Sequence, residues 1–291
     1  MSSRPSLHHT ITQHIIEAMK NAKNTAMPWL HNHGMPCNAH SQHVYQGINI
    51  LNLWVTANKK NYVSNQWATY KQWQKLGAQV NRGEVGASVM YYQPRIHEVE
   101  DAAGKRIHAI MKHSIVFNAQ QVDGYKEIVA VKPSPVESVN HADAFVQHTQ
   151  AKIEHGNAYA CYKMKSDVIL MPDKSLFIGS KTSTPTQSYY AVLLHELTHW
   201  TGHSQRCNRQ MNGMLADERY AMEELVAELG AAFLCAELGI TPEPRQDHAN
   251  YLASWISALE DNDRAIFAAA RMASEAVGFL HALQPDMEVA A

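Results

Sequence analysis

Five consecutive residues in the second half of the chain, His195-Glu196-Leu197-Thr198-His199, have the types and spacing of a hydrolytic metal site. Two histidines four residues apart lie on one face of an α-helix, so both imidazoles can reach a single metal ion. The glutamate between them points toward the open position of that ion, where a general base is needed. The motif therefore predicts a helix with two metal ligands, His195 and His199, and a catalytic base, Glu196.

The residues around this motif favour a buried helix. Most side chains from Tyr189 to Trp200 are apolar, hydroxyl residues suited to an N-cap precede them, and Gly202 offers a C-terminal stop. A solvated helix that carried two histidines by chance would show more Lys, Glu and Gln on its other faces. A metal-bearing helix explains the segment better.

A hydrolytic zinc site needs a third protein ligand and keeps its fourth position open for water. His203 follows in the same helical phase, but we expect Gly202 to end the helix before it. A second helix, predicted from Ala221 to Leu234, is nearly uncharged except for three glutamates. An acidic ligand from this helix is the better candidate.

Glu224 and Glu228 lie one turn apart on the second helix, among Leu, Val, Ala and Phe side chains. Like charges at this spacing repel, so a nearby cation explains them better than a solvated face does. We predict Glu224 as the third ligand. Glu228 is either an alternative ligand or the carboxylate that holds a ligand histidine by its free ring N–H. Glu223 is expected to face solvent.

The chemistry predicted for this site is peptide hydrolysis. The ion lowers the pKa of bound water from 15.7 toward about 7, and Glu196 takes its proton during attack on a peptide carbonyl. We expect Zn²⁺, with Mn²⁺ or another divalent metal as the alternative. Tyr220 and His248 are equal candidates for stabilising the transition state. Val168-Ile169-Leu170-Met171 reads as a strand that either pairs with an extended peptide substrate or belongs to the core.

Composition indicates a folded protein with room for two domains. The 291 residues are 45% hydrophobic and 18% charged. No apolar run approaches the length of a membrane span, the N-terminus lacks the hydrophobic stretch of a signal peptide, and the four cysteines show no paired spacing. We expect a cytoplasmic protein with no membrane partner.

Charge divides the chain into two parts. Residues 1–132 hold 14 Lys and Arg against 7 Asp and Glu, a balance of +7, whereas residues 133–291 hold 11 against 20, a balance of −9. A segment rich in Pro and Ser lies between them, which is typical of a linker. We therefore predict domains at 1–130 and 141–291, joined by a linker at 131–140. The basic first half suggests a polyanionic partner.

Aromatic and basic residues interleave in the first half, as they do in proteins that hold single-stranded nucleic acid by base stacking and phosphate contacts. Burial of the rings in the domain core is an equally good explanation. The segment Thr69 to Leu76, for example, looks like an amphipathic helix on which Trp73 packs inward. The candidate DNA-binding residues are Tyr45, Trp54, Lys59, Lys60, Trp67, Tyr70, Lys71, Trp73, Lys75 and Arg82.

The chain resembles ArdC-type antirestriction proteins along both halves. In the first half the resemblance rests on Tyr45–Trp54, Trp67–Trp73 and Leu76–Gly86, which are also similar to the N-terminal domain of plasmid TraC-type primases. In the second half it rests on His195–His203 and Tyr220–Glu228, where Glu224 and Glu228 are similar to the Glu-x-x-Ala-Asp signature of gluzincins.

The resemblance implies an α+β fold of two domains. The first would be a mixed α/β domain that binds single-stranded DNA, and the second a mainly helical zincin-like metallopeptidase domain with a small sheet. It further implies a protein of a conjugative plasmid or similar mobile element that protects incoming DNA from host restriction. The protein would then also act in the recipient cell. Host restriction enzymes or another protein would then be the substrate.

Two functions remain open at the level of sequence. In the first, the protein is an active metallopeptidase that DNA targets; in the second, it is a DNA-binding protector whose metal domain is structural or a binding platform. The presence of Glu196 favours the first, because a purely structural metal site has no use for a general base and tends to close its fourth position.

Overall fold

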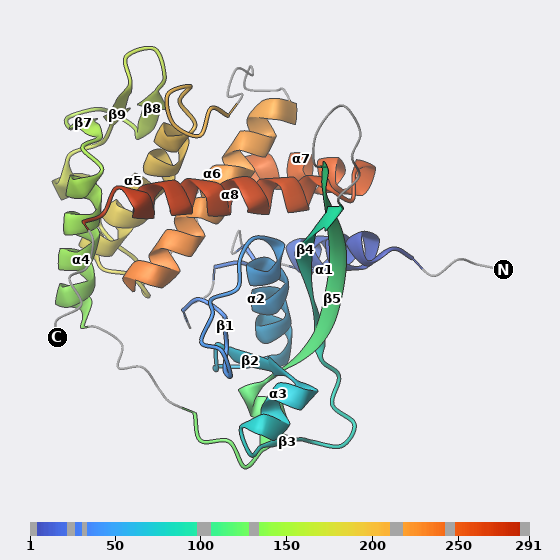
Figure 1. The fold of residues 1–291 in the computed structure, drawn as a ribbon. Helices are drawn as coiled ribbons and strands as arrows, with labels where there is room; N and C mark the ends of the chain where they lie inside the picture. Colours follow the sequence, from blue (N-terminus) through green and yellow to red (C-terminus); the bar gives the residue numbers. More distant parts are fainter. Residues whose placement is uncertain are drawn as a thin grey trace. The chain divides into compact units, whose positions relative to one another are not determined.

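The computed structural model describes residues 5–21, 27–30, 34–97, 106–127, 134–209, 218–241 and 248–285. Its internal contacts divide the chain into two compact units (Figure 1). One unit is Pro36–Ile128, and the other combines Met1–Met35 with Val129–Ala291. The first is mixed α/β and the second is mainly helical with a small sheet, which confirms the predicted α+β class.

The unit Pro36–Ile128 is built on a sheet with the strand order β1-β2-β5-β4. Its strands are β1 (Cys37–Asn38), β2 (Gln66–Thr69), β4 (Ala87–His97) and β5 (Arg106–Asn118). Helix α2 (Ile48–Lys60) contributes Leu53 to a core that also contains Trp67 and Val116. The amide of Asn49 on this helix exchanges two hydrogen bonds with the backbone of Met90 on β4, at 2.7 and 2.8 Å. These bonds fix the helix along the strand.

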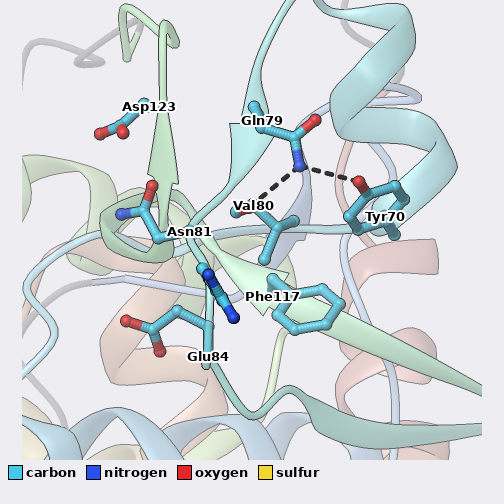
Figure 2. A pocket seen from close by; sticks show the side chains of 8 residues that line it. Tyr70, Gln79, Val80, Asn81, Glu84, Phe117 and Asp123 are labelled. Carbon is cyan, nitrogen blue, oxygen red and sulfur yellow. Dashed lines mark hydrogen bonds between the residues drawn. The ribbon is translucent and has the colours of Figure 1, made fainter.

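A short helix, α3 (Tyr70–Lys75), lies near a two-stranded ribbon of β3 (Gln79–Val80) and β6 (Val122–Asp123). Thr69 and Gln72 form a capping box that starts the helix. The 3-10 turn η1 (Ala119–Gln121) connects β5 to β6. Tyr70, the ribbon and neighbouring residues line a pocket of about 500 Å³, shown in Figure 2. Helix α3, with Thr69 as its N-cap and Leu76 as its C-cap, is the amphipathic helix predicted at Thr69 to Leu76.

The other unit contains the predicted metal helix and most of the remaining helices. They are α1 (Leu7–Asn21), α4 (Pro135–His148), the 3-10 turn η2 (Lys174–Leu176), α5 (Pro185–Thr201), α6 (Glu218–Leu238), α7 (His248–Asp261) and α8 (Ala265–Ala282). Helices α5, α6 and α8 pack on one another (Figure 1). No helix in the described part of the chain is long and apolar enough to cross a membrane.

A three-stranded sheet in the order β7-β9-β8 packs beside α5. Its strands are β7 (Lys152–Glu154), β8 (Cys161–Lys163) and β9 (Val168–Leu170). The strand predicted at Val168 to Met171 is therefore present, but the idea that it pairs with a substrate peptide is wrong. Both its edges are already hydrogen-bonded, to β7 in parallel and to β8 in antiparallel fashion. It is the central, buried strand.

Helix α5 begins and ends as its sequence indicates. Thr184 and Gln187 form a capping box, Pro185 occupies the first turn, and Gly202 is the C-cap. Helix α6 passes α5 so closely that a Cβ atom added to Gly230 would lie 2.5 Å from Cγ2 of Thr198. Glycine at 230 therefore permits the distance between the two helices.

The compact units differ from the domain boundaries predicted at 1–130 and 141–291. The apolar face of α1 contacts α7, and Thr12 donates a hydrogen bond of 2.7 Å to the carbonyl of Asp263. Burial of Ile11, Ile15 and Ile16 ties this helix to the C-terminal residues. The first 35 residues thus belong structurally to the unit that contains α5.

Gly230→Ala should lower the free energy of unfolding by about 1–3 kcal/mol, because the new methyl group overpacks the buried Thr198 side chain. Gly278→Ala is the matched control. It also replaces a helical glycine, nothing lies within 4 Å of its Cβ position, and it should stabilise the protein by about 0.5–1 kcal/mol. Urea unfolding measures both. Equal stability of the two variants would show that α5 and α6 are not in close contact.

Candidate metal centre

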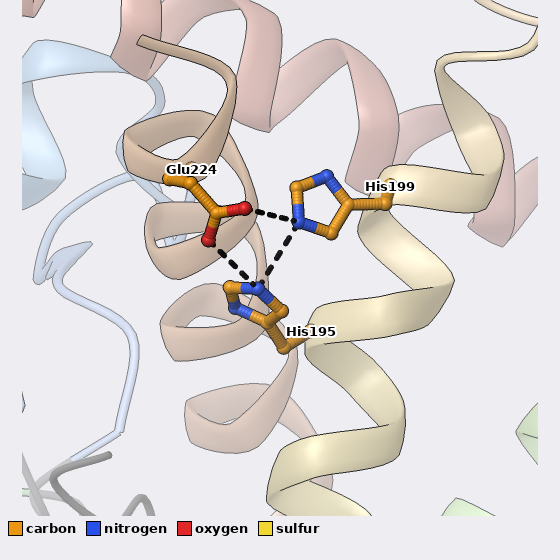
Figure 3. Close-up of side chains that lie close together, drawn as sticks. All are labelled: His195, His199 and Glu224. Atoms are coloured by element: carbon orange, nitrogen blue, oxygen red, sulfur yellow. Dashed lines mark hydrogen bonds and ion pairs between the residues drawn. The ribbon is translucent and has the colours of Figure 1, made fainter. Parts of the chain in front are cut away.

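Three side chains from α5 and α6 converge as the sequence predicts (Figure 3). The Nε2 atoms of His195 and His199 are 3.1 Å apart. Each lies 3.5 Å from a different carboxylate oxygen of Glu224, Oε2 for His195 and Oε1 for His199. All three ligand atoms fall within 4.8 Å of one another, and this is the metal-type cluster found among the described residues.

The opposite ring nitrogen of each histidine contacts a further carboxylate of α6. Nδ1 of His195 lies 3.1 Å from Oε1 of Glu228, and Nδ1 of His199 lies 3.2 Å from Oε1 of Glu223. At His199 the carboxylate of Glu223 can accept the Nδ1–H, which leaves the lone pair of Nε2 directed at the shared centre, whereas Glu228 lies within ion-pair distance of His195. Glu228 thus lies beside the far ring nitrogen of His195, whereas Glu224 lies beside the Nε2 atoms of both histidines.

The prediction that Glu223 faces solvent is wrong. Its side chain is 8% exposed and is held by Arg209, whose Nε and Nη2 atoms donate at 3.0 and 2.8 Å. Arg209 also donates to the carbonyl of Thr198 at 2.7 Å and to the hydroxyl of Thr201 at 2.8 Å. One guanidinium thus joins the last turn of α5 to the carboxylate that orients His199.

The electrostatic field at this cluster favours a cation. Burial by itself would lower the pKa of His199, but hydrogen bonds to Glu223 and Glu224 outweigh it and raise that pKa to about 10. For Glu224, burial acts to raise the pKa, and the hydrogen bonds with both histidines outweigh it and lower the pKa below its usual range. Positive charge between the imidazoles and the carboxylate is therefore stabilised.

The residues fit a divalent metal ion. Two neutral imidazoles with Nε2 lone pairs 3.1 Å apart repel each other unless a cation lies between them. Two imidazole nitrogens and one carboxylate oxygen form the ligand set of catalytic zinc sites, and first-row metals such as Mn²⁺ accept the same atoms.

The cluster lines a cleft of about 770 Å³. Glu196, the predicted base, is 2% exposed and lines the same cleft as the three ligand side chains. Tyr220 lies there too and interacts with Glu224 and Tyr251. The side chain of His248, the other candidate for transition-state stabilisation, lies outside the described part of the structure. Tyr220 is thus the candidate that the structure brings to the cleft.

Several cleft residues had no role in the sequence analysis. Cys161 and Tyr162 come from β8, Tyr251 from α7, and Arg209 supports the site from the segment after α5. Spacing along the chain gives no signal for them, because tertiary packing alone brings their elements to α5. Glu223 could have been found, since it lies next to Glu224 in the middle of α6, where the helix is apolar around most of its circumference.

The ten candidate DNA-binding residues comprise three that are buried, one that is half-buried and six that are exposed. Trp54, Trp67 and Trp73 are at most 2% exposed, and Nε1 of Trp73 donates to the carbonyl of Phe117 at 3.0 Å. The prediction that these three rings stack on bases is wrong, because they fill the core. Tyr45 is half-buried against the same core as Trp67. The residues exposed to solvent are Lys59, Lys60, Tyr70, Lys71, Lys75 and Arg82.

Comparison with known proteins agrees with the fold and the site. Residues 5–125 match the model for the N-terminal domain of anti-restriction factor ArdC, and residues 140–272 match the zincin-like metallopeptidase model. The Mn(II)-bound crystal structure of ArdC from plasmid R388 is 34% identical with a TM-score of 0.80, covering 98% of this chain and all of that chain. The chain belongs to the ArdC family of antirestriction proteins.

Two curated relatives extend this comparison. A protein of Sinorhizobium fredii named y4eC is 36% identical, over 97% of this chain and 94% of its own length. DNA primase TraC of Escherichia coli is 34% identical over 95% of this chain, which spans only 27% of the primase. The fold of the ArdC family therefore covers nearly the whole chain, with the zincin-like domain at residues 140–272, and a divalent metal at the cluster agrees with the Mn(II)-bound ArdC.

Arg209→Ala should weaken metal binding by about 10- to 100-fold, because Glu223 loses its partner and no longer fixes His199. Arg271→Ala is the matched control, since Arg271 forms an exposed pair with Glu275 on α8. Competition with a chromophoric chelator measures Zn²⁺ and Mn²⁺ affinity. An unchanged affinity in Arg209→Ala would show that His199 is oriented without this contact.

Proposed function

We propose that this member of the ArdC family protects incoming DNA from restriction by binding single-stranded DNA and hydrolysing a protein substrate. One observation carries the catalytic part. His195, His199 and Glu224 converge in the same cleft that Glu196 lines, and each histidine has its own supporting carboxylate. Such supporting contacts are typical of sites whose ligands must hold a defined orientation.

The protein's own residues have separable parts in this chemistry. A divalent ion bound by the three ligand side chains would polarise a peptide carbonyl and lower the pKa of a water molecule beside it. Glu196 would take the proton from that water and transfer it to the leaving amine. The hydroxyl of Tyr220 would donate a hydrogen bond to the developing oxyanion. Glu228 and Glu223 would keep both imidazoles oriented throughout.

An extended peptide would bind along β8. This strand pairs with β9 on one side, and Cys161 and Tyr162 from it line the cleft. An edge strand offers backbone donors and acceptors to a peptide in extended conformation, and the cleft places Glu196 and the ligand histidines beside it. Tyr159, which is 66% exposed, would add an apolar contact at the cleft's rim.

Exposed cations support DNA binding by the unit Pro36–Ile128. The lysines at 59, 60, 71 and 75 are exposed, and residues 36–128 hold 10 Lys and Arg against 6 Asp and Glu, a balance of +4. Basic residues attract the phosphates of DNA. The family resemblance and exposed rings such as Tyr70, on which unpaired bases can stack, support a preference for single strands over duplexes. The relative TraC is a DNA primase. In this proposal the protein is encoded by a plasmid or similar mobile element and acts in the bacterial cytoplasm, including that of a recipient cell.

A second function, protection by DNA binding with a purely structural metal domain, fits the cleft less well. A structural zinc site closes its coordination with a fourth protein ligand. Among the described residues, the cluster has three such side chains, and a buried glutamate without a ligand position lines the cleft with them. We therefore favour the catalytic function, with Zn²⁺ or Mn²⁺ as the ion.

Glu196→Gln separates these two functions. The change removes the base but retains the shape of the side chain, so metal content and affinity for single-stranded DNA should stay at the parent's level. Peptide hydrolysis and protection of unmodified DNA from restriction should both fall by at least about 100-fold. Metal analysis, strand binding and a plasmid-transfer assay into a restricting host provide the measurements. Full protection by the variant would exclude catalysis as the mechanism.

Replacing Lys71 and Lys75 together by Ala should weaken binding to single strands. Each lost phosphate contact should reduce the slope of log affinity against log salt concentration by about 0.7. The pair Lys165→Ala and Lys181→Ala, two exposed lysines of the other unit, is the control. Fluorescence anisotropy over a salt series measures both. An equal loss in the control would indicate a non-specific effect of charge.

A further inference from the structure

The backbone of β9 alternates between its two neighbouring strands, and this decides which residue of β8 faces the open edge of the sheet. Successive residues of a strand turn their N–H and C=O groups to opposite sides. Met171, directly after β9, turns to the β7 side: its N–H donates to the carbonyl of Glu154 at 2.8 Å, and its carbonyl accepts from the N–H of Asn157 at 3.2 Å. Leu170 and Val168, one and three residues earlier, therefore turn to β8.

Tyr162 is the residue of β8 that faces away from β9. Cys161 is the register partner of Leu170. Lys163 is the partner of Val168, so both residues that flank Tyr162 direct their backbone groups at β9. Tyr162 turns its N–H and C=O to the other side, where β8 is the outer strand of the sheet in the described part of the chain. It also lines the cleft of the metal centre, so its backbone offers a donor and an acceptor to an extended peptide.

The side chain of Tyr162 is held by an ion pair. Its hydroxyl donates to Oδ1 of Asp167 at 2.7 Å and accepts from Nη2 of Arg206 at 3.0 Å. The guanidinium of Arg206 also donates to both carboxylate oxygens of Asp167, from Nη1 to Oδ2 at 3.0 Å and from Nη2 to Oδ1. The side chain of Arg206 is only 9% exposed. A two-point pair of this kind fixes geometry as well as charge, so the hydroxyl of Tyr162 has one defined position.

Arg206 connects this contact to the helix that carries the histidine ligands. Its Nε donates to the carbonyl of Trp200 at 2.6 Å, and its guanidinium carbon lies 3.8 Å from the centre of the Trp200 ring. Trp200 directly follows His199 on α5. The segment after α5 thus carries two arginines with separate tasks, because Arg209 contacts Glu223 beside the metal centre and Arg206 contacts β8.

We propose that Tyr162 is the substrate-binding residue of β8, pairing its backbone N–H and C=O with the main chain of an extended peptide, and that Arg206 and Asp167 are positioning residues for it. Arg206 sets where this backbone lies relative to His195 and His199. This role rests on the proposed peptidase function and adds to it the register of the bound peptide and the side chains that maintain that register.

The test compares two hydroxamates, one with and one without a peptide backbone. Acetohydroxamate is large enough to contact only the bound metal ion, whereas prolyl-leucyl-glycyl hydroxamate also extends a peptide backbone along β8. The full chain loaded with Zn²⁺ should bind the peptide hydroxamate at least about 10-fold more tightly, which corresponds to two hydrogen bonds. Titration calorimetry measures both affinities and requires no turnover.

Tyr162→Phe should weaken binding of the peptide hydroxamate by about 3- to 10-fold, and Arg206→Ala should weaken it further, because the backbone of β8 is no longer held in place. Affinity for acetohydroxamate and for Zn²⁺ should stay at the parent's level, whereas a general loss of structure would lower all three. Tyr190→Phe is the matched control. The hydroxyl of Tyr190 also donates to an aspartate, Asp143, at 2.7 Å, but Tyr190 does not line the cleft.

Amide hydrogen exchange, followed by NMR, reports the register directly. Exchange at the amide of Tyr162 should slow when the peptide hydroxamate binds. Exchange at Cys161 and Lys163 should not change, because their amides already face β9. Thermal unfolding establishes that each variant is folded, and Tyr162→Phe, the smaller change, provides the result if Arg206→Ala unfolds.

Equal affinity of the parent for the two hydroxamates, parental affinity for the peptide hydroxamate in both variants, or unchanged exchange at Tyr162 would overturn the role of this residue while leaving the peptidase function in place. Failure of the Zn²⁺-loaded parent to bind either hydroxamate would overturn the open metal cleft, and with it the proposed peptidase function. The two failures are therefore distinguishable in one set of titrations.

Discussion

The distance between α5 and α6 is the constraint on which the zincin-like part of the chain, residues 140–272, depends. Thr198 of α5 lies between the two ligand histidines in sequence, and it faces Gly230 of α6, where a Cβ atom would approach within 2.5 Å. This close contact allows one glutamate to reach both imidazoles at 3.5 Å and two others to reach their far nitrogens. A wider separation would leave buried carboxylates without partners, which is costly.

Groups of opposite charge face one another across the interface between α5 and α6. Three carboxylates of α6 face two imidazoles of α5, and Arg209 adds a positive charge beside Glu223. The field of the remaining carboxylates favours a further cation at the position shared by the Nε2 atoms. A divalent ion at that position both satisfies the field and links the two helices, so metal binding and the packing of the unit are coupled.

The two units use aromatic residues in different ways. In Pro36–Ile128 the tryptophans build the core on which α2 and α3 rest, and smaller exposed groups such as Tyr70 remain at the surface. In the zincin-like part of the chain, tyrosines from several elements border the cleft, and Tyr220 contacts the carboxylate of Glu224. A count of aromatic residues in a segment therefore says little about binding until burial is known.

The sequence by itself determined the motif His195 to His199 and the helix that carries it, because helical periodicity and capping are local properties, and it narrowed the partner carboxylate to Glu224 or Glu228. It also determined the α+β class and the ArdC family resemblance. Only the tertiary structure decided that Glu223 is buried against Arg209, that α1 belongs with α7, that β9 is central, and that Trp54, Trp67 and Trp73 are core. These outcomes depend on contacts between residues far apart in the chain, and no local pattern specifies which side of a ring or helix another element will cover.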